Sequence, residues 1–495
     1  MAEIELKLRG TPARLKAVLT RLQKRAVKGS AFTKNLHAVY FDTAKDDLHA
    51  KGLSLRVREE GGCFVQTLKQ TPAGGEALTR GEWSDRVAAA APELLNTHSG
   101  RKLRQVWKDL RLLPRFRTVI ARSGFVLSPK PGTEIEIVRD EGEIRVLGRD
   151  GGAAAVSEIE IELKKGPLSA VYGLALEIVA KTRVQIEPRG KSDRGYALLS
   201  PGAAALSVKA ELPRAKAGDT LAEVLRAAAR RHFAQVLVNM AGALKQDPGS
   251  IHRMRVSLRR LRSALYGARR LLPKAEYESV RLKLKYLLQS LGPARDWEVL
   301  TGRMSDLVDE EGIGDVQRAA GVRKSRALMQ AADVLGARKA TKAVLEVMRW
   351  FEDLPASRQG RKLKIRACDA AGDILCELFD RVRRRSRHFE RQSVEGRHRL
   401  RIAGKNLRYN IELYGGLYPK RKVEEFLALL KPVQDDLGHL NDVGRARDLL
   451  GELARRSPRK AAAASVVARL EARAAAAEKR AGKHVAALRN AKPFW

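Results

Sequence analysis

Charged and aliphatic residues alternate in several short segments within the first 200 residues of the chain. In Glu3-Ile4-Glu5-Leu6-Lys7-Leu8, the two carboxylates and the ammonium group would share one face of a strand, and the aliphatic side chains would share the other. The segment Glu158-Ile159-Glu160-Ile161-Glu162 repeats the pattern with carboxylates alone. Carboxylate oxygens suit Mg²⁺ or Mn²⁺, which usually bridge a protein to substrate phosphates. The spacing therefore indicates a metal site that acts on phosphate groups.

Cationic residues alternate in the same way in other segments. Arg56-Val57-Arg58 and Thr67-Leu68-Lys69 each place cations on one strand face, and Glu60-Gly61-Gly62 between them predicts a hairpin turn. An antiparallel sheet with one solvated face gives the same alternation, and for any single strand this is the commoner explanation. If the strands instead close into a barrel, the charges line its interior, where an ionic ligand is needed to compensate their burial. A metal-bound polyphosphate is such a ligand.

These segments resemble the CYTH domain, which is the triphosphate tunnel metalloenzyme family. The resemblance rests on the opening Glu-x-Glu-x-Lys, on the strand at 53–58 and on the Glu-rich strand at 158–162. Further matching positions are Thr67-Leu68-Lys69, Glu82, Arg122, the Glu134/Glu136 strand with Asp140-Glu141-Gly142, and the segment from Lys191 to Tyr196. The resemblance implies an eight-stranded antiparallel β-barrel, the triphosphate tunnel, over residues 1–203.

The resemblance also implies roles for individual residues. The catalytic residues would be Glu3, Glu5 and Lys7, and Mg²⁺ or Mn²⁺ would be held by Glu3, Glu5, Glu160 and Glu162. The substrate would be bound by Arg56, Arg58, Lys69, Glu82, Arg122 and Lys191. Because Glu158, Glu160 and Glu162 share one face, the sequence leaves open which two are ligands. Arg117 and Arg122 differ in parity, so without a bulge only one points inward, and the family motif favours Arg122.

The C-terminal part contains an internal duplication with an offset of 146 residues. The pattern His-x-x-Arg-x-x-x-(Arg/Lys)-x-x-Arg occurs twice, as His252, Arg255, Arg259 and Arg262 and again as His398, Arg401, Lys405 and Arg408. In each copy a Leu-Gly-x-x-x-Asp motif follows, ending at Asp296 and Asp442. At about 100° per residue, the four basic positions fall within an arc of roughly 80° on a helix. Each copy therefore predicts a helix with basic residues along one side.

Like charges are stacked along these predicted helices. Arg255 is followed by Arg259 at the i, i+4 spacing where they repel, and the second copy repeats this arrangement. A solvated helix face is the ordinary explanation of a single Arg-rich helix, but the same spacing in two copies favours an anion-binding surface. His252 and His398 either contact the ligand, adding charge below about pH 6.5, or are core residues near helix starts. We expect Asp296 and Asp442 to orient an arginine or cap a helix.

These repeated residues resemble the CHAD domain, an all-α family generally understood to bind inorganic polyphosphate. The resemblance covers residues 216–455 and implies a duplicated helical-bundle domain in which the two sets of His, Arg and Lys residues contact polyphosphate. CHAD domains frequently follow CYTH domains in one bacterial chain. The remaining residues, 456–495, are rich in Ala, Lys and Arg, and predict a basic helical tail that is exposed or loosely docked.

Composition limits the class of protein and its partners. The chain has 495 residues and a net charge of +39, with 35 Lys and Arg against 24 Asp and Glu in residues 1–200, and 61 against 33 in residues 201–495. So much positive charge indicates a polyanionic partner. No apolar window is long enough to span a membrane, the N-terminus lacks the pattern of a secretory signal, and the three cysteines match no zinc-ligand spacing. The expected location is the cytoplasm, and association with polyphosphate granules is a further expectation.

The main functional hypothesis is a metal-dependent triphosphatase that acts on inorganic triphosphate or a related triphosphate, with a C-terminal module that binds polyphosphate. One alternative is a polyphosphate-binding protein whose tunnel is catalytically idle. Another is nucleic-acid binding, which we expect only nonspecifically because aromatic residues are 5% of the chain and no stacking motif occurs. The last is cyclisation of ATP in the same tunnel. The sequence does not determine the oligomeric state.

Overall fold

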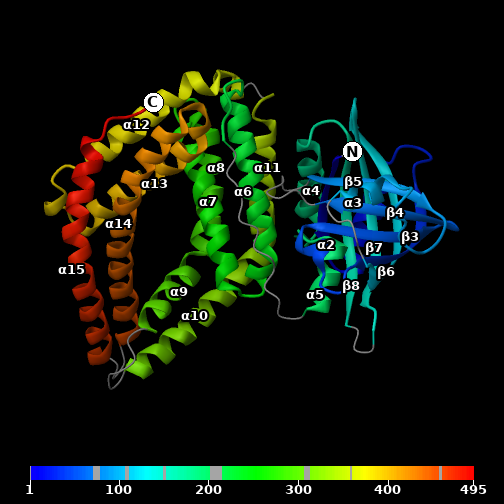
Figure 1. Cartoon of the computed structure of the whole chain (residues 1–495), viewed down its shortest axis with the longest axis horizontal. Coiled ribbons are helices and arrows are strands. Elements are labelled where there is room, and N and C mark those ends of the chain that lie inside the picture. Colours follow the sequence, from blue (N-terminus) through cyan, green and yellow to red (C-terminus); the bar gives the residue numbers. More distant parts are fainter. Residues whose placement is uncertain are drawn as a thin grey trace. The chain divides into compact units, whose positions relative to one another are not determined.

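The computed structural model describes residues 2–70, 79–105, 111–148, 152–200, 214–305, 313–356, 359–455 and 460–495 (Figure 1). The chain divides into two compact units. One comprises residues 1–211 with 233–241 and 336–352, and the other comprises residues 212–232, 242–335 and 353–495. The β-sheet lies in the first unit, and most of the long helices lie in the second.

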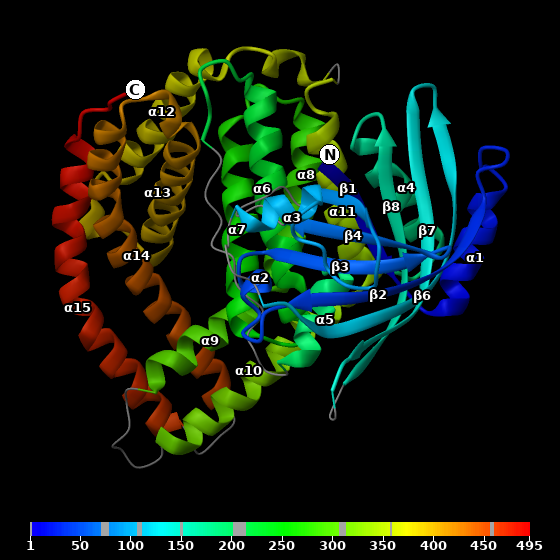
Figure 2. The ribbon, with the colours of Figure 1, turned by 45° about the vertical axis from the view of Figure 1, so that its right-hand side comes forward.

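An antiparallel sheet dominates the first unit. Its strands are β1 (Ala2–Arg9), β2 (Phe32–Asp42), β3 (Leu53–Glu60), β4 (Cys63–Gln70), β5 (Thr79–Val87), β6 (Leu113–Lys130), β7 (Thr133–Val146), β8 (Ala153–Lys165) and β9 (Gln185–Ile186). The strand order is β5-β4-β3-β2-β6-β7-β8-β1-β9. The long strands β6, β7 and β8 run side by side and are conspicuous in Figure 2.

The strand β1 has neighbours at both of its ends. Residues 2–4 pair with residues 79–81 of β5, and Leu8 and Arg9 pair with β9. The predicted eight-stranded barrel is therefore confirmed only as an antiparallel sheet, and the predicted strand number was wrong for the described part of the chain. The sheet has nine strands because β9, only two residues long, adds to the end of β1 that β5 does not reach.

The hairpin between β3 and β4 forms where the sequence predicts it. Glu60 pairs with Cys63, so the loop consists of Gly61 and Gly62, whose φ angles are +59° and +78°. A two-residue loop with positive φ at both positions matches the twist of the flanking strands, and glycine adopts it without a steric cost. The turn fixes the register of these strands, which places Lys69 opposite Ser54.

Both faces of β1 are buried. Leu6 and Leu8 are 1% and 0% exposed, and helices α1 and α4 pack on this part of the sheet. Glu5 and Lys7, on the other face, are 9% and 7% exposed. The ordinary explanation of this alternation, a sheet with one solvated face, is therefore wrong for β1. Its charged side chains lie in an interior, where they require partners of opposite charge.

Five helices accompany the described strands. They are α1 (Pro12–Gln23), α2 (Asp47–Ala50), α3 (His98–Arg104), α4 (Ser169–Lys181) and α5 (Lys191–Leu199). The helix α5 packs on β6, β7 and β8 and begins at Lys191. The carboxylate of Asp193 accepts a hydrogen bond of 2.7 Å from the backbone N–H of Gly190, which fixes this start. The first turn of α5 thereby brings Lys191 to the charged face of the strands.

The C-terminal part of the chain is helical. Its α-helices are α6 (Leu221–Leu244), α7 (Pro248–Gly267), α8 (Lys274–Ser290), α9 (Gly292–Met304), α10 (Ile313–Gly336), α11 (Arg338–Asp353), α12 (Ala367–Arg385), α13 (Val394–Tyr414), α14 (Lys420–Ala454) and α15 (Lys460–Asn490). Within the second unit, α13 packs against α7, α12 and α14. None of the helices in the described residues is both long enough and apolar enough to cross a membrane.

The helix boundaries repeat with the same offset as the sequence. The helices α6 and α12 begin at Leu221 and Ala367, which are 146 residues apart. The N-caps of α7 and α13 are Asp247 and Ser393, again 146 residues apart, and each side chain accepts a hydrogen bond from a backbone N–H of the first turn. Two polar caps at equivalent positions start two equivalent helices, so the duplication extends from the sequence to the fold.

The tail is docked rather than exposed. The helix α15 runs beside α14 in Figures 1 and 2 and buries one apolar stripe against the rest of the unit. This stripe consists of Ala463, Val466, Leu470, Ala474, Ala477, Ala481, Val485 and Leu488. The spacing of three and four residues is that of one helix face. The expectation of an exposed or loosely docked helix is therefore wrong, because the alanines are contact residues and not merely helix formers.

Candidate functional site

The strand register gathers charged residues on one face of the sheet. Lys7 pairs with Glu160 across β1 and β8, and Asp140 pairs with Glu158 across β7 and β8. Arg122 of β6 pairs in turn with Asp140. Paired residues point to the same side of a sheet, so these side chains meet although they come from four strands.

Three carboxylates form the centre of this face, and we refer to Asp140, Glu158 and Glu160 as the carboxylate cluster. Each offers an oxygen atom within 4.8 Å of the others, and all three side chains are buried. Such proximity of negative charges in an interior is unfavourable unless cations neutralise them. Oxygen ligands at this spacing are the set that Mg²⁺ or Mn²⁺ prefers.

Two cationic side chains neutralise the carboxylate cluster. Lys191 Nζ lies 2.6 Å from Asp140 Oδ2, 2.6 Å from Glu158 Oε1 and 2.9 Å from Glu160 Oε1. Arg122 donates two hydrogen bonds to Asp140, of 2.7 and 2.6 Å, and one of 2.5 Å to Glu160. Two parallel hydrogen bonds from one guanidinium group, as in the Arg122–Asp140 pair, are among the strongest contacts that a carboxylate forms.

The attraction between these cations and the carboxylates shifts the pKa values of both. Burial alone would raise the pKa of Glu160, but the charges of Lys191, Arg122 and Lys7 outweigh it and hold this pKa well below its ordinary value. Burial alone would lower the pKa of Lys191, whereas the three carboxylates raise it well above its ordinary value. Glu160 and Lys191 therefore carry opposite charges near neutral pH.

The donor set of the carboxylate cluster fits a divalent cation. Three buried carboxylates supply hard oxygen ligands, and Lys191 lies where it contacts all three. A bound divalent ion would compete with this ammonium group for the same oxygen atoms. The residues that would hold the ion are Asp140, Glu158 and Glu160, of which only Glu160 is among the four ligands inferred from the sequence.

The other predicted metal ligands have different surroundings. The side chain of Glu3 lies outside the described residues. Glu5 forms an ion pair with Lys7 and pairs across the strands with Glu162. The carboxylate of Glu162 lies 2.8 Å from Lys164 Nζ, and burial raises its pKa, an effect that nearby Glu136 and Glu5 reinforce.

The predicted substrate-binding residues of β3, β4 and β5 lie on the same strand face as one another. Lys69 and Glu82 are paired across β4 and β5, with 3.3 Å between Nζ and Oε2. Burial lowers the pKa of Arg58, and the charge of Arg56 lowers it further. The Nε atoms of Arg56 and Arg58 are buried and have no hydrogen-bond partner in the described structure. Unsatisfied donors beside a repelling neighbour are suited to receive an anion.

The sequence analysis left Glu158 as an open candidate ligand and named Asp140 and the segment with Arg194 only as matching positions, without a role. Asp140 and Glu158 complete the carboxylate cluster, and Arg194 Nη2 lies 2.8 Å from Glu158 Oε2. The signals were present: Asp140 has the parity of Glu136 on β7, and Arg194 follows Lys191 by three residues on one helix. What the sequence lacks is the strand register, which brings Asp140 opposite Glu158.

A second group of charges lies on α7 and α13, which pack against each other. The two repeated sets of basic residues fall on these helices, and we call them the basic stripes: His252, Arg255, Arg259 and Arg262 on α7, and His398, Arg401, Lys405 and Arg408 on α13. Arg259 lowers the pKa of Arg255 on its own helix and of Arg401 and Lys405 on the other. The two stripes therefore share one electrostatic field.

The basic stripes carry an excess of unpaired positive charge. Burial lowers the pKa of Lys405 to about 7, and the charges of Arg401 and Arg259 contribute to this shift against Asp442. Burial, assisted by Arg259 and opposed by Asp296, lowers the pKa of Arg255 to about 10. The buried Nε atoms of Arg259 and Arg401 have no hydrogen-bond partner in the described structure. Cations whose pKa values fall because of their neighbours gain most from a bound anion.

Several residues of the stripes have neutral or acidic hydrogen-bond partners. Arg255 Nη1 donates to the backbone oxygen of Leu288 at 2.9 Å. His398 Nδ1 lies 2.7 Å from Asn441 Oδ1, and Arg408 Nε donates to Glu412 at 2.8 Å. Neither histidine of the stripes is a core residue, because His252 is half-buried and His398 is exposed. Burial and neighbouring arginines lower the pKa of His252 to about 4, so it is neutral near pH 6.5 in the free protein.

The two repeated aspartates each bind an arginine of the other copy. Asp442 of α14 lies 3.0 Å from Arg303 of α9, and Asp296 of α9 lies 3.0 Å from Arg445 of α14. These reciprocal ion pairs join α9 and α14. They agree with the expected role in orienting an arginine and add negative charge beside the stripes, as the pKa of Lys405 indicates.

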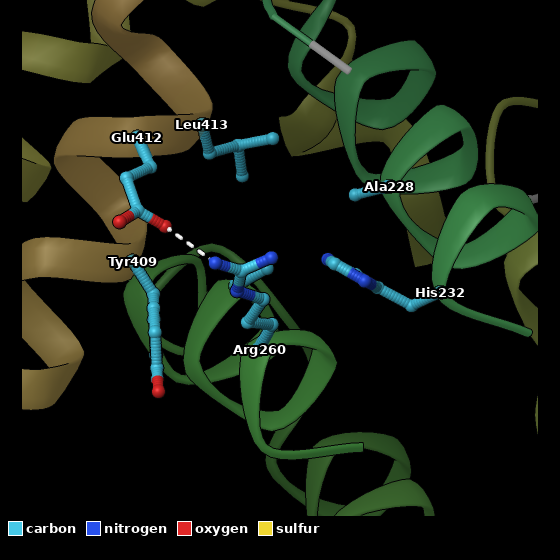
Figure 3. A pocket seen from close by; sticks show the side chains of 7 residues that line it. Ala228, His232, Arg260, Tyr409, Glu412 and Leu413 are labelled. Atoms are coloured by element: carbon cyan, nitrogen blue, oxygen red, sulfur yellow. Dashed lines mark ion pairs between the residues drawn. The ribbon is translucent and has the colours of Figure 1, made fainter. Parts of the chain in front are cut away.

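A small polar cavity adjoins the stripes between α6, α7 and α13 (Figure 3). Its volume is about 10 Å³, which is room for about one water molecule. Arg260 and Glu412 form an ion pair of 3.3 Å across it, and His232 points toward Arg260. Burial and the charges of Arg260 and Arg231 lower the pKa of His232 to about 3, so this histidine is neutral. The cavity is too small for a ligand, and Glu412, which lines it, also accepts a hydrogen bond from Arg408.

Comparison with known proteins identifies both parts of the chain. Residues 1–196 match the CYTH domain and residues 227–451 match the CHAD domain. The chain therefore joins a CYTH domain, the domain of the triphosphate tunnel metalloenzymes, to a CHAD domain, as the sequence motifs predict. The crystal structure of the CHAD domain from the plant Ricinus communis is similar to the chain at 27% identity and a TM-score of 0.51, covering 58% of this chain and 98% of that one.

Other solved structures that are similar to the chain have lower identities. A putative adenylyl cyclase from Hippeastrum, described as having a dominant triphosphatase activity, is 21% identical, with a TM-score of 0.30, and the match covers 42% of this chain and 100% of that one. The PH1819 protein from Pyrococcus horikoshii is 19% identical, with a TM-score of 0.26, and the match covers 40% of this chain and 97% of that one.

Proposed function

We propose that the CYTH domain of this protein is a Mg²⁺- or Mn²⁺-dependent triphosphatase and that its CHAD domain binds inorganic polyphosphate. The observation that carries the first half is the buried carboxylate cluster, which both Arg122 of β6 and Lys191 of α5 contact. Membership of the CYTH family supports a triphosphate as substrate. Inorganic triphosphate is the simplest such substrate, because the site described requires no contact to a base or sugar.

The tunnel is part of this proposal. We infer that the pairing of β1 with β5 closes the sheet around the charged face, so that a linear triphosphate enters between strands. The buried charges of Glu5, Lys7 and Glu160 support an enclosed interior.

The residues of the chain have distinct roles in the proposed reaction. Arg56 and Arg58 bind phosphate oxygens with their unsatisfied N–H groups, and Lys69 adds a third cation. Asp140, Glu158 and Glu160 would hold the divalent ion, which would supply Lewis-acid polarisation and a water of lowered pKa. Lys191, released from the carboxylates it contacts, offers its ammonium group to the substrate. Closing strands exclude bulk water and strengthen each of these interactions.

The proposed role of the CHAD domain rests on the basic stripes. Polyphosphate carries a regular row of negative charges and no bases, so a surface of Arg and Lys on two packed helices is sufficient to bind it. The lowered pKa values of Arg255 and Lys405 support a surface that lacks its anion. We infer that this domain retains polyphosphate near the enzyme, and association with polyphosphate granules follows from it.

The test measures phosphate release from inorganic triphosphate with Mg²⁺ or Mn²⁺. Wild type is compared with Glu160→Gln, which keeps the shape of a cluster carboxylate and removes its charge, and we expect a loss of at least about 100-fold. Glu143→Gln is the matched control, because Glu143 lies on the opposite parity of β7 and is 39% exposed beside Arg145. Its activity should equal that of wild type.

A different result would favour the second hypothesis. If wild type releases no phosphate with either metal while polyphosphate still binds, the protein is a polyphosphate-binding protein and the ionic cluster of the sheet is structural. Production of cyclic AMP and pyrophosphate from ATP would instead assign the cluster to nucleotide cyclisation.

A further inference from the structure

A second basic cleft lies in the helical unit, at the C-terminal ends of α12 and α15. Its volume is about 410 Å³, and it is lined by Asp380, Arg383, Arg384, Arg387, Arg489 and Asn490. We call it the α12–α15 cleft. None of these residues belongs to the basic stripes, which lie on α7 and α13. A cleft of this volume is large enough for a small ligand.

The charges of the cleft are almost all positive. Four guanidinium groups face one carboxylate, that of Asp380. Within the described structure no acidic side chain forms an ion pair with Arg384, Arg387 or Arg489. Arg383 lies over the ring of Phe379, with 5.8 Å from its guanidinium carbon to the ring centroid. The cleft therefore has an uncompensated positive charge and several free N–H donors.

The internal duplication indicates that the fold does not require these arginines. The helices α6 and α12 begin at equivalent positions, so Arg383, Arg384 and Arg387 correspond to Leu237, Val238 and Ala241. The same helix therefore forms with apolar residues in the first copy and with three arginines in the second. A cation in the last turn of a helix is favoured by the free carbonyl groups there, but several together repel one another, and a bound anion would relieve this repulsion.

We propose that the α12–α15 cleft is a second anion-binding site of this protein and that its ligand is a condensed phosphate. Guanidinium groups recognise phosphate oxygens in pairs, and four of them around one cleft suit an anion with several phosphate charges better than a single carboxylate or chloride. The ligand is either a free small anion such as pyrophosphate or a segment of a long polyphosphate chain. The inference rests on the cleft and does not depend on hydrolysis in the sheet.

The first experiment is titration calorimetry of the full chain with pyrophosphate, in EDTA so that no divalent ion is present. The variant Arg384→Glu/Arg387→Glu reverses two charges of the cleft. The matched control Arg421→Glu/Lys422→Glu makes the same change of charge at the exposed start of α14. We expect the cleft variant to lose one binding event, or to weaken it at least about tenfold, as two charge-assisted contacts require. The control should change affinity less than about twofold.

The cleft also has a local fluorescent reporter. The ring of Trp495 lies 5.8 Å from that of Phe379, which Arg383 covers. Pyrophosphate should therefore change the tryptophan emission of wild type, and Trp495→Phe should remove that change. This readout distinguishes the cleft from anion binding in the stripes or the sheet.

The same titrations with long-chain polyphosphate identify the source of the ligand. A loss confined to polyphosphate assigns the cleft to a segment of a long chain, and a loss with pyrophosphate assigns it to a small anion. Equal losses in the cleft variant and the control would overturn the proposal, because they would reflect net charge alone. Unchanged binding of both pyrophosphate and long-chain polyphosphate in the cleft variant would overturn it as well. Arg384→Ala/Arg387→Ala serves as a second variant should the charge reversal alter the thermal unfolding midpoint.

Discussion

The carboxylate cluster of the sheet and the basic stripes of the helices differ in how their charged side chains are compensated. In the sheet, cations and anions from four strands and one helix are interleaved, and Lys191 alone contacts three carboxylates. In the helices, cations of two packed elements face one another, and the pKa of Lys405 falls to about 7 by burial and by its neighbouring arginines. In the sheet, neighbours of opposite charge stabilise each ionised group. In the helices, neighbours of like charge destabilise each ionised group unless an anion is bound.

This difference in charge arrangement explains how each site would select its ligand. A metal and a triphosphate together carry both signs of charge, so a site for them needs both signs in place and in register. Polyphosphate carries one sign only, so a surface of one sign suffices and needs no fixed register. The sheet fixes side-chain positions through its strand pairing, whereas two helices present long, adjustable side chains along a row.

The largest expected effect is reversal of charge in the basic stripes. In Arg255→Glu/Arg401→Glu, two half-buried cations become anions beside Asp296 and Asp442, so polyphosphate affinity should fall at least about 100-fold. Phosphate release from triphosphate should remain within about twofold of wild type, since the two sites are separate. Calorimetry and the phosphate assay measure the two properties. If polyphosphate affinity and phosphate release fell together, the two sites would not be independent.

A smaller effect is a dependence of polyphosphate binding on pH. The pKa of Lys405 is about 7 in the free protein, and a bound polyanion raises it, so binding takes up a proton. Affinity is therefore greatest below pH 7 and should be about tenfold weaker at pH 8 than at pH 6. Calorimetry in buffers of different ionisation enthalpy measures the proton uptake. In Lys405→Met the uptake near pH 7 should disappear; an unchanged uptake would assign it to another group.

The smallest expected effect concerns the ammonium group in the carboxylate cluster. Lys191→Met removes the cation that contacts all three carboxylates, so the free protein loses stability and gains affinity for a divalent cation. Addition of Mg²⁺ should raise the thermal unfolding midpoint of this variant by about 2–4 °C more than that of wild type.

A matched control variant tests whether Mg²⁺ binds at the carboxylate cluster or at Glu162. Lys164→Met removes an ammonium group from Glu162 and Glu136, and its response to Mg²⁺ should match that of wild type. A larger response in Lys164→Met than in Lys191→Met would place the ion at Glu162, which is the ligand inferred from the sequence.

Local patterns predicted much of this protein. The alternation in β1, the Gly61-Gly62 turn and the 146-residue duplication each have a counterpart in the structure. The first two could be predicted because they depend on a short period and on a φ preference, and the third because the same residues recur at a fixed offset. The nine strands and the docked α15 could not, because a two-residue strand has no pattern of its own and an Ala-rich helix does not indicate what it contacts.

The residue pattern alone indicates which residue types share each face: carboxylates with lysine on one strand, and His, Arg and Lys along one side of each repeated helix. Which of these side chains meet depends on how the strands and helices pack. Asp140 joins Glu158 and Glu160, and Lys191 enters their centre, because strand register and the start of α5 bring together residues up to 51 positions apart. Periodicity describes one element at a time, and the charge balance of a site depends on the pairing between elements.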